Sequence, residues 1–403
     1  MSYTTPVLID STNWPFFLTP QSQLWGPYEY DGKVFLLAGE ESGLTNVRVY
    51  KGAVASPEGS FVECDTANRK YSLGLASPFY PGSGTKLYVA NRTNTTEVTI
   101  SVFDMGTETW DADITTFTTD TTSGWLHLVK SGTDYVLIYR KSSTFKLWWT
   151  KYDGASWSSP ARVDGYSGSE TVNGTAVVVD DDGLLHIAWG QSLGFLGHQA
   201  GYARTLDPAT GTLGTIRELD ADFAWAGAGT EFDDEIAYPT IRPIDFALGT
   251  ARMSTGTPTS DPTWTTEEID PSEYATDNAA VRYGGTLYYF WVDYAYQIRY
   301  VYKTAGGTWS AAVTLYDADG QSYLDGGVLT PFGVDNYIHR LSVTKLSTGD
   351  FGIMFAGYVN PYSTAFYFVA TLGAPSPNAG NFAYFGSPSF GISKSSSGHG
   401  WFT

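Results

Sequence analysis

The sequence has a single cysteine, Cys64, among its 403 residues. It therefore cannot form an intramolecular disulfide, and it lacks the set of cysteines and histidines that structural zinc sites use. No run of about 18 apolar residues occurs, so we expect no membrane insertion. The first residues also lack the basic segment followed by an apolar stretch that makes a signal peptide.

Positive charge is scarce as well. Lysine and arginine together number 23 against 42 aspartate and glutamate residues, which gives a net charge of -19. Such a surface repels nucleic-acid phosphates and anionic membranes, so we expect no nucleic-acid partner. Residues that favour helices are sparse, whereas aromatic residues make up 16% of the chain and glycines number 44. The chain is acidic, and its shortage of helix-favouring residues together with its many aromatic residues and glycines predicts an all-β protein of strands and turns.

One unit recurs along the chain: an apolar strand, a glycine turn, a strongly aromatic strand, a loop, a third strand, a turn and a fourth strand. The clearest copy begins at Ala279, with its aromatic strand at 287–292 and its third strand at 297–303. Turns before the second strand mark seven copies, spaced at about fifty residues, which is the spacing of propeller blades. They lie at Gly32, Gly84, Gly132, Gly183, near Glu235, Gly285 and Gly349.

The repeat predicts a single domain over 1–403, a seven-bladed β-propeller of four-stranded antiparallel blades. The fifth copy is the weakest, because Pro239 falls in a strand and proline suits only an edge or a bulge. Val7–Ile9 and Phe382–Phe385 are left over, and we expect these terminal segments to close the ring. A pair of β-sandwiches is the competing architecture. The predicted blades span 22–65, 72–118, 123–165, 172–220, 228–270, 277–317 and 338–386, with residues 1–10 closing.

The turns between third and fourth strands carry aspartate, glycine and tryptophan at short spacing. They are Asp153-Gly154-x-x-Trp157, Gly306-x-x-Trp309, Asp104-x-Gly106-x-x-x-Trp110 and Asp261-x-x-Trp264. These turns resemble the Asp-box turns of BNR-repeat, sialidase-like propellers. The resemblance implies a propeller in which each tryptophan ring plugs its blade.

A second resemblance lies in the fourth copy. Its residues are Asp182-Gly183-Leu-Leu-His186, Trp189, His198, Tyr202 and Arg204. They are similar to a strand of the BNR-type propellers that include polysaccharide lyases. The resemblance implies His186 or His198 with Tyr202 as proton carriers, and Arg204 as the group that neutralises a uronic carboxylate. Two alternatives stay open: His186 as a satisfied core residue, because strand alternation places it on the same face as Leu184 and Ala188, and His198 as an ordinary surface histidine.

Arginines recur in the third strand of several copies, at Arg48, Arg204, Arg252 and Arg299. A sialidase resemblance implies three arginines for a substrate carboxylate. Repetition at an equivalent position instead favours a structural role between blades, which is the interpretation we prefer.

Loops that join second to third strands are the predicted binding site, because in a propeller they open on one face. Tyrosine, aspartate, glutamine and arginine together suit sugars, since aromatic rings stack on C–H faces while polar groups bind hydroxyls. Ordinary loop composition is the alternative. The predicted ligand-binding residues are Glu41, Arg92, Arg140, Gln191, Asp293, Tyr294, Tyr296 and Tyr358.

Metal and cofactor sites are not expected. The run Asp180-Asp181-Asp182-Gly183 admits a calcium hypothesis, but consecutive aspartates before glycine are typical of a turn, and a calcium loop needs alternate ligands.

Together these features predict a lectin-like propeller that binds a glycan or polysaccharide, and we expect it to be a phage tail or fibre-associated virion structural protein that contacts other virion proteins. The missing leader favours a virion or extracellular location. The alternative is a secreted polysaccharide lyase or glycoside hydrolase of the BNR-propeller type.

Overall fold

The structure is a computed structural model of the whole chain, and it consists of strands and turns. It describes residues 1–14, 24–39, 46–54, 61–71, 76–119, 126–141, 143–165, 171–192, 199–221, 225–226, 229–243, 249–293, 295–319, 321–332, 338–359 and 362–372. Within these ranges there are 34 strands and no α-helix. Consequently, no helix in the described part of the chain is long and apolar enough to cross a membrane.

The first four sheets each come from one continuous stretch of chain and are antiparallel. Sheet 1 contains β3 (Leu24–Tyr30), β4 (Lys33–Gly39), β5 (Asn46–Ala53), β6 (Val62–Cys64) and β7 (Lys70–Tyr71). Sheet 2 contains β8 (Ala76–Phe79), β9 (Lys86–Arg92), β10 (Glu97–Asp104), β11 (Thr109–Trp110) and β12 (Thr115–Thr118). Sheet 3 contains β13 (Leu126–Ser131), β14 (Asp134–Arg140), β15 (Leu147–Tyr152) and β16 (Ala161–Arg162). Sheet 4 contains β17 (Thr171–Val179), β18 (Leu185–Ser192), β19 (Gln199–Asp207), β20 (Thr212–Leu213) and β21 (Arg217–Asp220).

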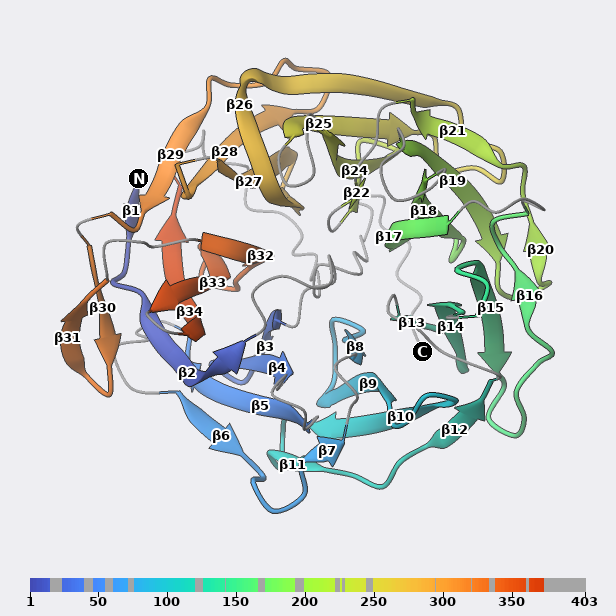
Figure 1. Cartoon of the computed structure of the whole chain (residues 1–403), viewed down its shortest axis with the longest axis horizontal. Helices are drawn as coiled ribbons and strands as arrows, with labels where there is room; N and C mark the ends of the chain where they lie inside the picture. Colours follow the sequence, from blue (N-terminus) through green and yellow to red (C-terminus); the bar gives the residue numbers. More distant parts are fainter. Residues whose placement is uncertain are drawn as a thin grey trace.

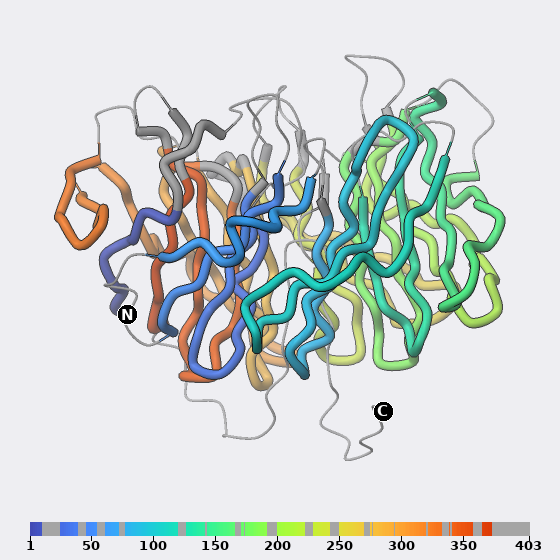
Figure 2. The backbone as a smooth tube through the Cα atoms, turned by 90° about the horizontal axis from the view of Figure 1, so that it is seen from below, coloured from blue at the N-terminus to red at the C-terminus, as the bar shows by residue number. Residues whose placement is uncertain are grey.

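The last two sheets are larger. Sheet 5 contains β22 (Trp225–Ala226), β23 (Thr230–Phe232), β24 (Glu235–Pro243), β25 (Gly249–Gly256), β26 (Trp264–Tyr283), β27 (Thr286–Asp293), β28 (Gln297–Thr304) and β29 (Val313–Asp317). Sheet 6 contains β1 (Ser2–Tyr3), β2 (Val7–Trp14), β30 (Ser322–Asp325), β31 (Val328–Pro331), β32 (Ile338–Lys345), β33 (Phe351–Val359) and β34 (Tyr362–Thr371). The sheets follow one another around a common axis, as in a β-propeller (Figure 1), and their strands run between its two ends (Figure 2).

The hydrogen bonding makes six sheets, and the predicted count of seven is wrong in this respect. The cause is β26, a strand of 20 residues that runs through the predicted fifth and sixth copies without a break. Its first part pairs with β25 and its second part with β27, and Ala275 is registered with both neighbours. The two predicted modules therefore share one eight-stranded sheet.

The ring closes through the N-terminal strand. In sheet 6, β2 pairs antiparallel with β34, with Val7 opposite Tyr367. Residues 1–14 and 362–372 thus complete one sheet from opposite ends of the sequence. Phe382–Phe385, the other predicted closing segment, lies outside the described residues.

The core consists of layers between neighbouring sheets. One apolar cluster joins residues of sheets 2, 3 and 4, and another joins sheets 5 and 6. Central strands are covered on both faces, which explains why β27 reads as an unbroken apolar and aromatic run and is buried along its length. Outer strands alternate instead: in β12 only Phe117 is buried.

Neighbouring sheets are also joined by polar contacts. Tyr238 donates a hydrogen bond to the carbonyl of His186, and Ser342 donates one to that of Gly26. These bonds link sheet 5 to sheet 4 and sheet 6 to sheet 1. The other such contacts are Leu128 N to Ser77 Oγ (3.0 Å), His127 Nε2 with Thr175 Oγ1, and Leu341 N to Asp277 Oδ2 (3.2 Å).

Asp153 shapes a tight turn between the third and fourth strands of sheet 3. Asp153 Oδ1 accepts hydrogen bonds from the backbone of Ala155 (2.9 Å) and Ser156 (2.8 Å), and Gly154 has a φ of 94°. Trp157 packs on Phe117 of sheet 2, with ring centroids 5.0 Å apart. The ring therefore fills the space between sheets 2 and 3.

Candidate functional site

The candidate site lies at the end of the sheets where second strands run into third strands, which we call the front end. Two of these loops can be compared from the last registered pair of their strands, which is Arg140 with Leu147 in sheet 3 and Val292 with Ile298 in sheet 5. Phe145 lies two residues before Leu147, and Tyr296 lies two residues before Ile298. The two loops thus carry an aromatic residue at the same distance before the third strand.

Both aromatic residues have left-handed backbone conformations. Phe145 has a φ of 54° and Tyr296 a φ of 59°. For a bulky L-residue this conformation costs about 1–2 kcal/mol, because Cβ crowds the neighbouring carbonyl oxygen. The strain therefore points to a role for these side chains that glycine could not fill.

Phe145 is the more exposed of the two, with 44% of its surface accessible. Its backbone is held by two hydrogen bonds: its N–H donates to the Lys141 carbonyl (2.7 Å), and its carbonyl accepts from Val172 of sheet 4 (2.9 Å). The Arg140 guanidinium lies 5.4 Å from the ring centroid. Phe145 is thus an exposed ring on a fixed backbone, with a cation against it.

Two cationic side chains of this loop lie beside aromatic rings, Arg140 beside Phe145 and Lys141 beside Trp148. Arg140 donates to the Val172 carbonyl (2.8 Å), and burial lowers its pKa to about 10. The Lys141 ammonium lies 4.1 Å from the Trp148 ring centroid. The Arg140–Phe145 and Lys141–Trp148 contacts each hold a positive group beside an aromatic ring.

Tyr296 sits in a tighter loop. Its N–H donates to the Asp293 carbonyl (3.0 Å), and Asp293 Oδ1 accepts from the backbone of Gln297 (2.9 Å). Asp293 is 3% exposed, and its Oδ2 lies 3.8 Å from Arg299. Its carboxylate therefore shapes the loop that presents Tyr296, which is half-buried against the apolar cluster between sheets 5 and 6.

The other predicted binding residues are placed as follows. Arg92 ends β9 at the register position that Arg140 has in sheet 3; it donates to the Asn94 carbonyl (3.3 Å), and burial lowers its pKa. Gln191 lies near the end of β18, and its side-chain oxygen is buried with no hydrogen-bond partner among the described residues. The side chain of Tyr358 in β33, and the whole of Glu41 and Tyr294, lie outside the described residues.

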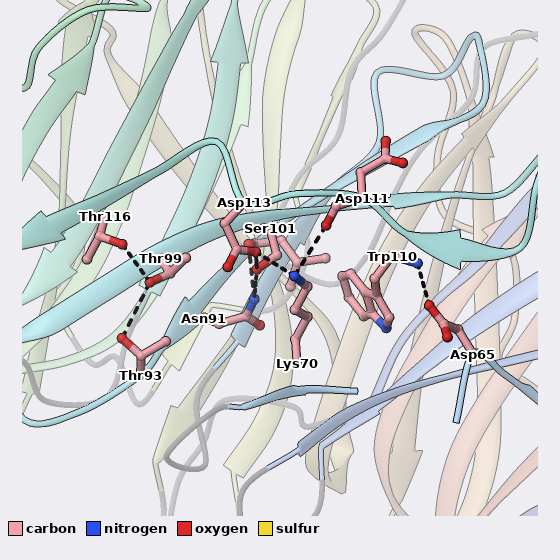
Figure 3. A network of polar contacts seen from close by, with 11 residues as sticks. Asp65, Lys70, Asn91, Thr93, Thr99, Ser101, Trp110, Asp111, Asp113 and Thr116 are labelled. Atoms are coloured by element: carbon pink, nitrogen blue, oxygen red, sulfur yellow. Dashed lines mark hydrogen bonds and ion pairs between the residues drawn. The ribbon is translucent and has the colours of Figure 1, made fainter. Parts of the chain in front are cut away.

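Polar side chains between sheets 1 and 2 hydrogen-bond to one another (Figure 3). Lys70 donates to Asp113 Oδ1 (2.8 Å), which also accepts from Ser101 Oγ (2.7 Å). Ser101 Oγ in turn accepts from the buried Asn91 amide (2.9 Å). This chain of bonds ties β7 to the middle of sheet 2.

Two of the residues predicted from the lyase resemblance, His186 and Arg204, form hydrogen bonds within the protein. His186 is 1% exposed and donates from Nε2 to Asp180 Oδ2 (2.8 Å). Arg204 donates to the carbonyls of Gly214 and, across the sheet boundary, Val163, both at 2.7 Å. Tyr202 packs near Trp189 at a centroid distance of 6.3 Å. His198 lies outside the described residues.

A second arginine of the third strands also spans a sheet boundary. Arg252 of sheet 5 contacts Asp220 of sheet 4 through Nη1 at 2.9 Å and 3.0 Å. Arg204 and Arg252 thus both link neighbouring sheets.

The aspartate run at 180–182 forms a turn. Asp180 Oδ1 accepts from the backbone of Asp182 (3.0 Å) and Leu184 (2.9 Å), while its other oxygen accepts from His186. Both oxygens of the Asp180 carboxylate, the first of the run, thus accept hydrogen bonds from the protein, so they are not left to bind a calcium ion. Within the described ranges no group of three or more histidine, cysteine, aspartate or glutamate side chains could hold a metal ion.

Sequence reasoning did not single out Phe145 or Trp148. The signal was present: an aromatic residue stands two positions before the first registered residue of the third strand in both loops. The copies differ in loop length by several residues, so this equivalence appears only once the strand register is known.

Comparison with known proteins supports the fold. No family model matches the sequence, and no curated protein matches it. Among solved structures, the lectin BP39L from Burkholderia pseudomallei is similar with a TM-score of 0.58 and 11% identity over 89% of this chain and 99% of the lectin. The polysaccharide lyase Uly1 is similar with a TM-score of 0.53 and 9% identity over 90% of this chain and 92% of the lyase. At these identities the similarity shows a β-propeller fold.

Proposed function

We propose that this propeller binds a carbohydrate at its front end, with Phe145 as the aromatic platform. The observation that carries the proposal is the 44% exposure of a phenylalanine held in a left-handed conformation. A sugar ring presents a flat array of C–H groups, and an exposed aromatic ring of fixed position is the surface that such a face stacks on.

Tyr296 supplies a second platform at the same distance before the third strand. We further propose that the eight-stranded sheet acts as two blades, divided within β26, which gives seven modules around the axis. Phe145 then belongs to the third module and Tyr296 to the sixth. An extended saccharide or a branched one could contact several loops of the front end.

Binding without catalysis fits the described residues better than a lyase does. A proton carrier must reach the atom it deprotonates, whereas His186 is buried and bonded to Asp180. The propeller similarities to a lectin and to a lyase agree with either activity. Association with a virion, membership of the BNR family and an extracellular location stay predictions.

The test is a glycan array probed with the wild-type protein and with Phe145→Gly. Glycine relieves the left-handed strain, worth about 1 kcal/mol, and this offsets its backbone entropy cost of about 0.5–1 kcal/mol. We therefore expect the variant to keep its free energy of unfolding within about 1 kcal/mol and to lose at least about tenfold in affinity. A matched control is Tyr3→Ala, since Tyr3 on β1 is 40% exposed and is registered with Ala370, at the end of β34 that lies away from the front-end loop.

Three results would overturn the proposal. They are a wild-type protein that binds no glycan, a Phe145→Gly protein that binds as tightly as the wild type, and a loss of affinity in Tyr3→Ala equal to that in Phe145→Gly.

A further inference from the structure

The hairpin of β30 and β31 is an addition that the ring does not need. Ring closure uses β2 and β34, and the turns at Gly285 and Gly349 are farther apart than the about fifty residues that separate the other modules. The hairpin extends sheet 6 outward instead, where Leu324 of β30 donates to the Pro6 carbonyl (2.8 Å) beside β2. In Figure 1 it lies outside the ring, with β31 farthest from the axis.

The hairpin is anchored by aromatic residues and carries apolar residues on its outer strand. Tyr323 of β30 is buried, and its ring centroid lies 4.9 Å from that of Phe332 and 5.0 Å from that of Phe366 in β34. On β31, Val328 is 67% exposed and Leu329 is 63% exposed, more than any other large apolar residue in the described ranges. An apolar strand is thus held in a fixed position and open to solvent.

The main-chain groups of Leu329 point away from the hairpin. Within the described residues β31 pairs with β30 alone. Phe332 N–H donates to the Gln321 carbonyl (3.0 Å), and hydrogen-bonded pairs alternate along an antiparallel ladder. Thr330 and Val328 therefore turn their main-chain groups toward β30, whereas Leu329 turns its N–H and carbonyl away from it.

The outer strand β31 lacks the charges that protect other edges of this protein. Charged residues on an edge strand keep it from pairing with another chain. Outer strands of four other sheets carry such residues: Glu63 in β6, Arg162 in β16, Glu218 in β21 and Asp317 in β29. In contrast, β31 has the sequence Val-Leu-Thr-Pro. A twofold axis places each residue near its own copy, where like charges repel, so an uncharged strand is the part of an acidic chain that can meet itself.

We propose that β31 pairs antiparallel with β31 of a second copy of this chain, about a twofold axis at Leu329. Each Leu329 then donates its N–H to the carbonyl of the other and accepts a hydrogen bond in return. The two leucine side chains stand opposite each other, and Val328 stands opposite Thr330 of the second copy. Pro331 has no N–H to donate, so it limits the pairing to this short segment.

The contact is small, because each copy contributes one strand of four residues. It lies well below the area of about 1,200 Å² at which stable complexes begin, so we expect a dissociation constant on the order of 0.1 mM. The net charge of -19 opposes association at long range. Since the hairpin projects from the ring, it keeps the two acidic bodies apart, and added salt should strengthen the wild-type dimer.

The experiment exchanges charge at Leu329 and measures association by sedimentation equilibrium, at concentrations from about tenfold below to about fivefold above the expected dissociation constant. We expect the wild type to dimerise, and Leu329→Lys and Leu329→Glu each to weaken association about tenfold or more, because like charges then face each other across the axis. An equimolar mixture of these two variants should associate again, since opposite charges then meet, and salt should weaken this mixed dimer.

The matched control is Val62→Lys, because Val62 is 54% exposed on β6, an outer strand of sheet 1. We expect it to dimerise like the wild type. Urea denaturation of all variants, with unchanged midpoints, checks that they fold.

Four results would each overturn the inference. They are a wild type that stays monomeric over this range, Leu329 variants that associate like the wild type, an equal loss in Val62→Lys, and a mixture of Leu329→Lys with Leu329→Glu that stays monomeric. The last result would show that the contact is not centred on Leu329, even if the wild type dimerises. Glycan binding at Phe145 is independent of all four.

Discussion

Lys345, at the end of β32, is a buried lysine whose removal should stabilise the protein. It is 4% exposed, and its ammonium lies 3.8 Å from the Tyr283 centroid and donates to the Asp350 carbonyl (3.1 Å). Burial lowers its pKa from 10.5 to about 8, while the nearby Asp350 and Glu29 carboxylates act in the opposite direction. The charged form is thus disfavoured in the folded state.

The size of the effect follows from the two pKa values. A difference of one pH unit corresponds to 1.36 kcal/mol, so a fall from 10.5 to about 8 corresponds to about 3 kcal/mol at pH 7. Lys345→Met keeps an apolar stem of similar length and removes the charge, but it leaves the Asp350 carbonyl without its donor, at a cost of about 1 kcal/mol or more. We expect a net gain of about 1–3 kcal/mol at pH 7.

The pH dependence gives the sharper test. Between pH 8 and 10.5 the unfolded chain binds the Lys345 proton and the folded chain does not, so the wild type gains stability from this group as pH rises. The advantage of Lys345→Met should therefore be largest at pH 7 and vanish near pH 10.5. Urea denaturation of both proteins at pH 7, 8, 9 and 10 measures it as a difference, so that other titrating groups cancel.

Lys303→Met is the control for this prediction. Lys303 also lies over an aromatic ring, but it is paired with the Glu267 carboxylate at 2.7 Å, so we expect no gain in stability from its removal. The reasoning would be refuted if Lys345→Met were destabilised at pH 7, or if its gain were the same at pH 7 and pH 10.

Two further predictions concern the contacts between sheets. Burial lowers the pKa of His127 to about 3 from its usual 6.5, so on acidification the unfolded chain binds this proton before the folded chain does. The free energy of unfolding of His127→Gln should therefore fall by about 2 kcal/mol less than that of the wild type between pH 6.5 and pH 5. Urea denaturation at the two pH values measures this, and an equal fall in both proteins would contradict it. A Cβ on Gly214 would lie 2.1 Å from the Ser260 carbonyl oxygen of the neighbouring sheet, whereas a Cβ on Gly285 would meet nothing within 4 Å. Gly214→Ala should therefore lower the free energy of unfolding by about 2–4 kcal/mol, and Gly285→Ala by less than about 0.5 kcal/mol. Similar values for the two variants would count against the packing of these sheets.

The repeat made the architecture predictable, and the limits of that prediction have physical causes. A strand that is buried on both faces, such as β27, needs an unbroken run of apolar and aromatic residues, and such runs between turns can be read from the sequence. The sheet count is not, because nothing in the residues around Ala275 shows that one strand would pair with β25 and β27 in turn.

Pro239 illustrates a partly correct prediction. It lies inside β24, opposite Met253 of β25, as a strand residue. On its other side the inner neighbour is interrupted: β23 is registered with residues 235–237 and β22 with residues 240–241. Among the described strands none of the inner ones is registered with Pro239, so a missing N–H is tolerated there.

The candidate site was predictable in location and less so in its residues. Loops between second and third strands follow from the topology, and Arg140, Asp293 and Tyr296 lie in or beside them. Exposure and backbone conformation are not visible in a sequence, so Phe145 was passed over. His186 and Arg204 stood out for their chemistry, but their side chains are occupied by Asp180 and by backbone carbonyls.

The pairing of β2 with β34 has a consequence for how the chain is made. Val7 meets Tyr367, so β2 must wait until some 360 more residues have been synthesised before β34 exists to pair with it. During that interval its apolar edge is open to other chains, a condition that favours aggregation or capture by a chaperone. Moving residues 1–14 to follow residue 372 through a short linker would let the last sheet form from one continuous stretch, and would shorten the time for which that strand is exposed.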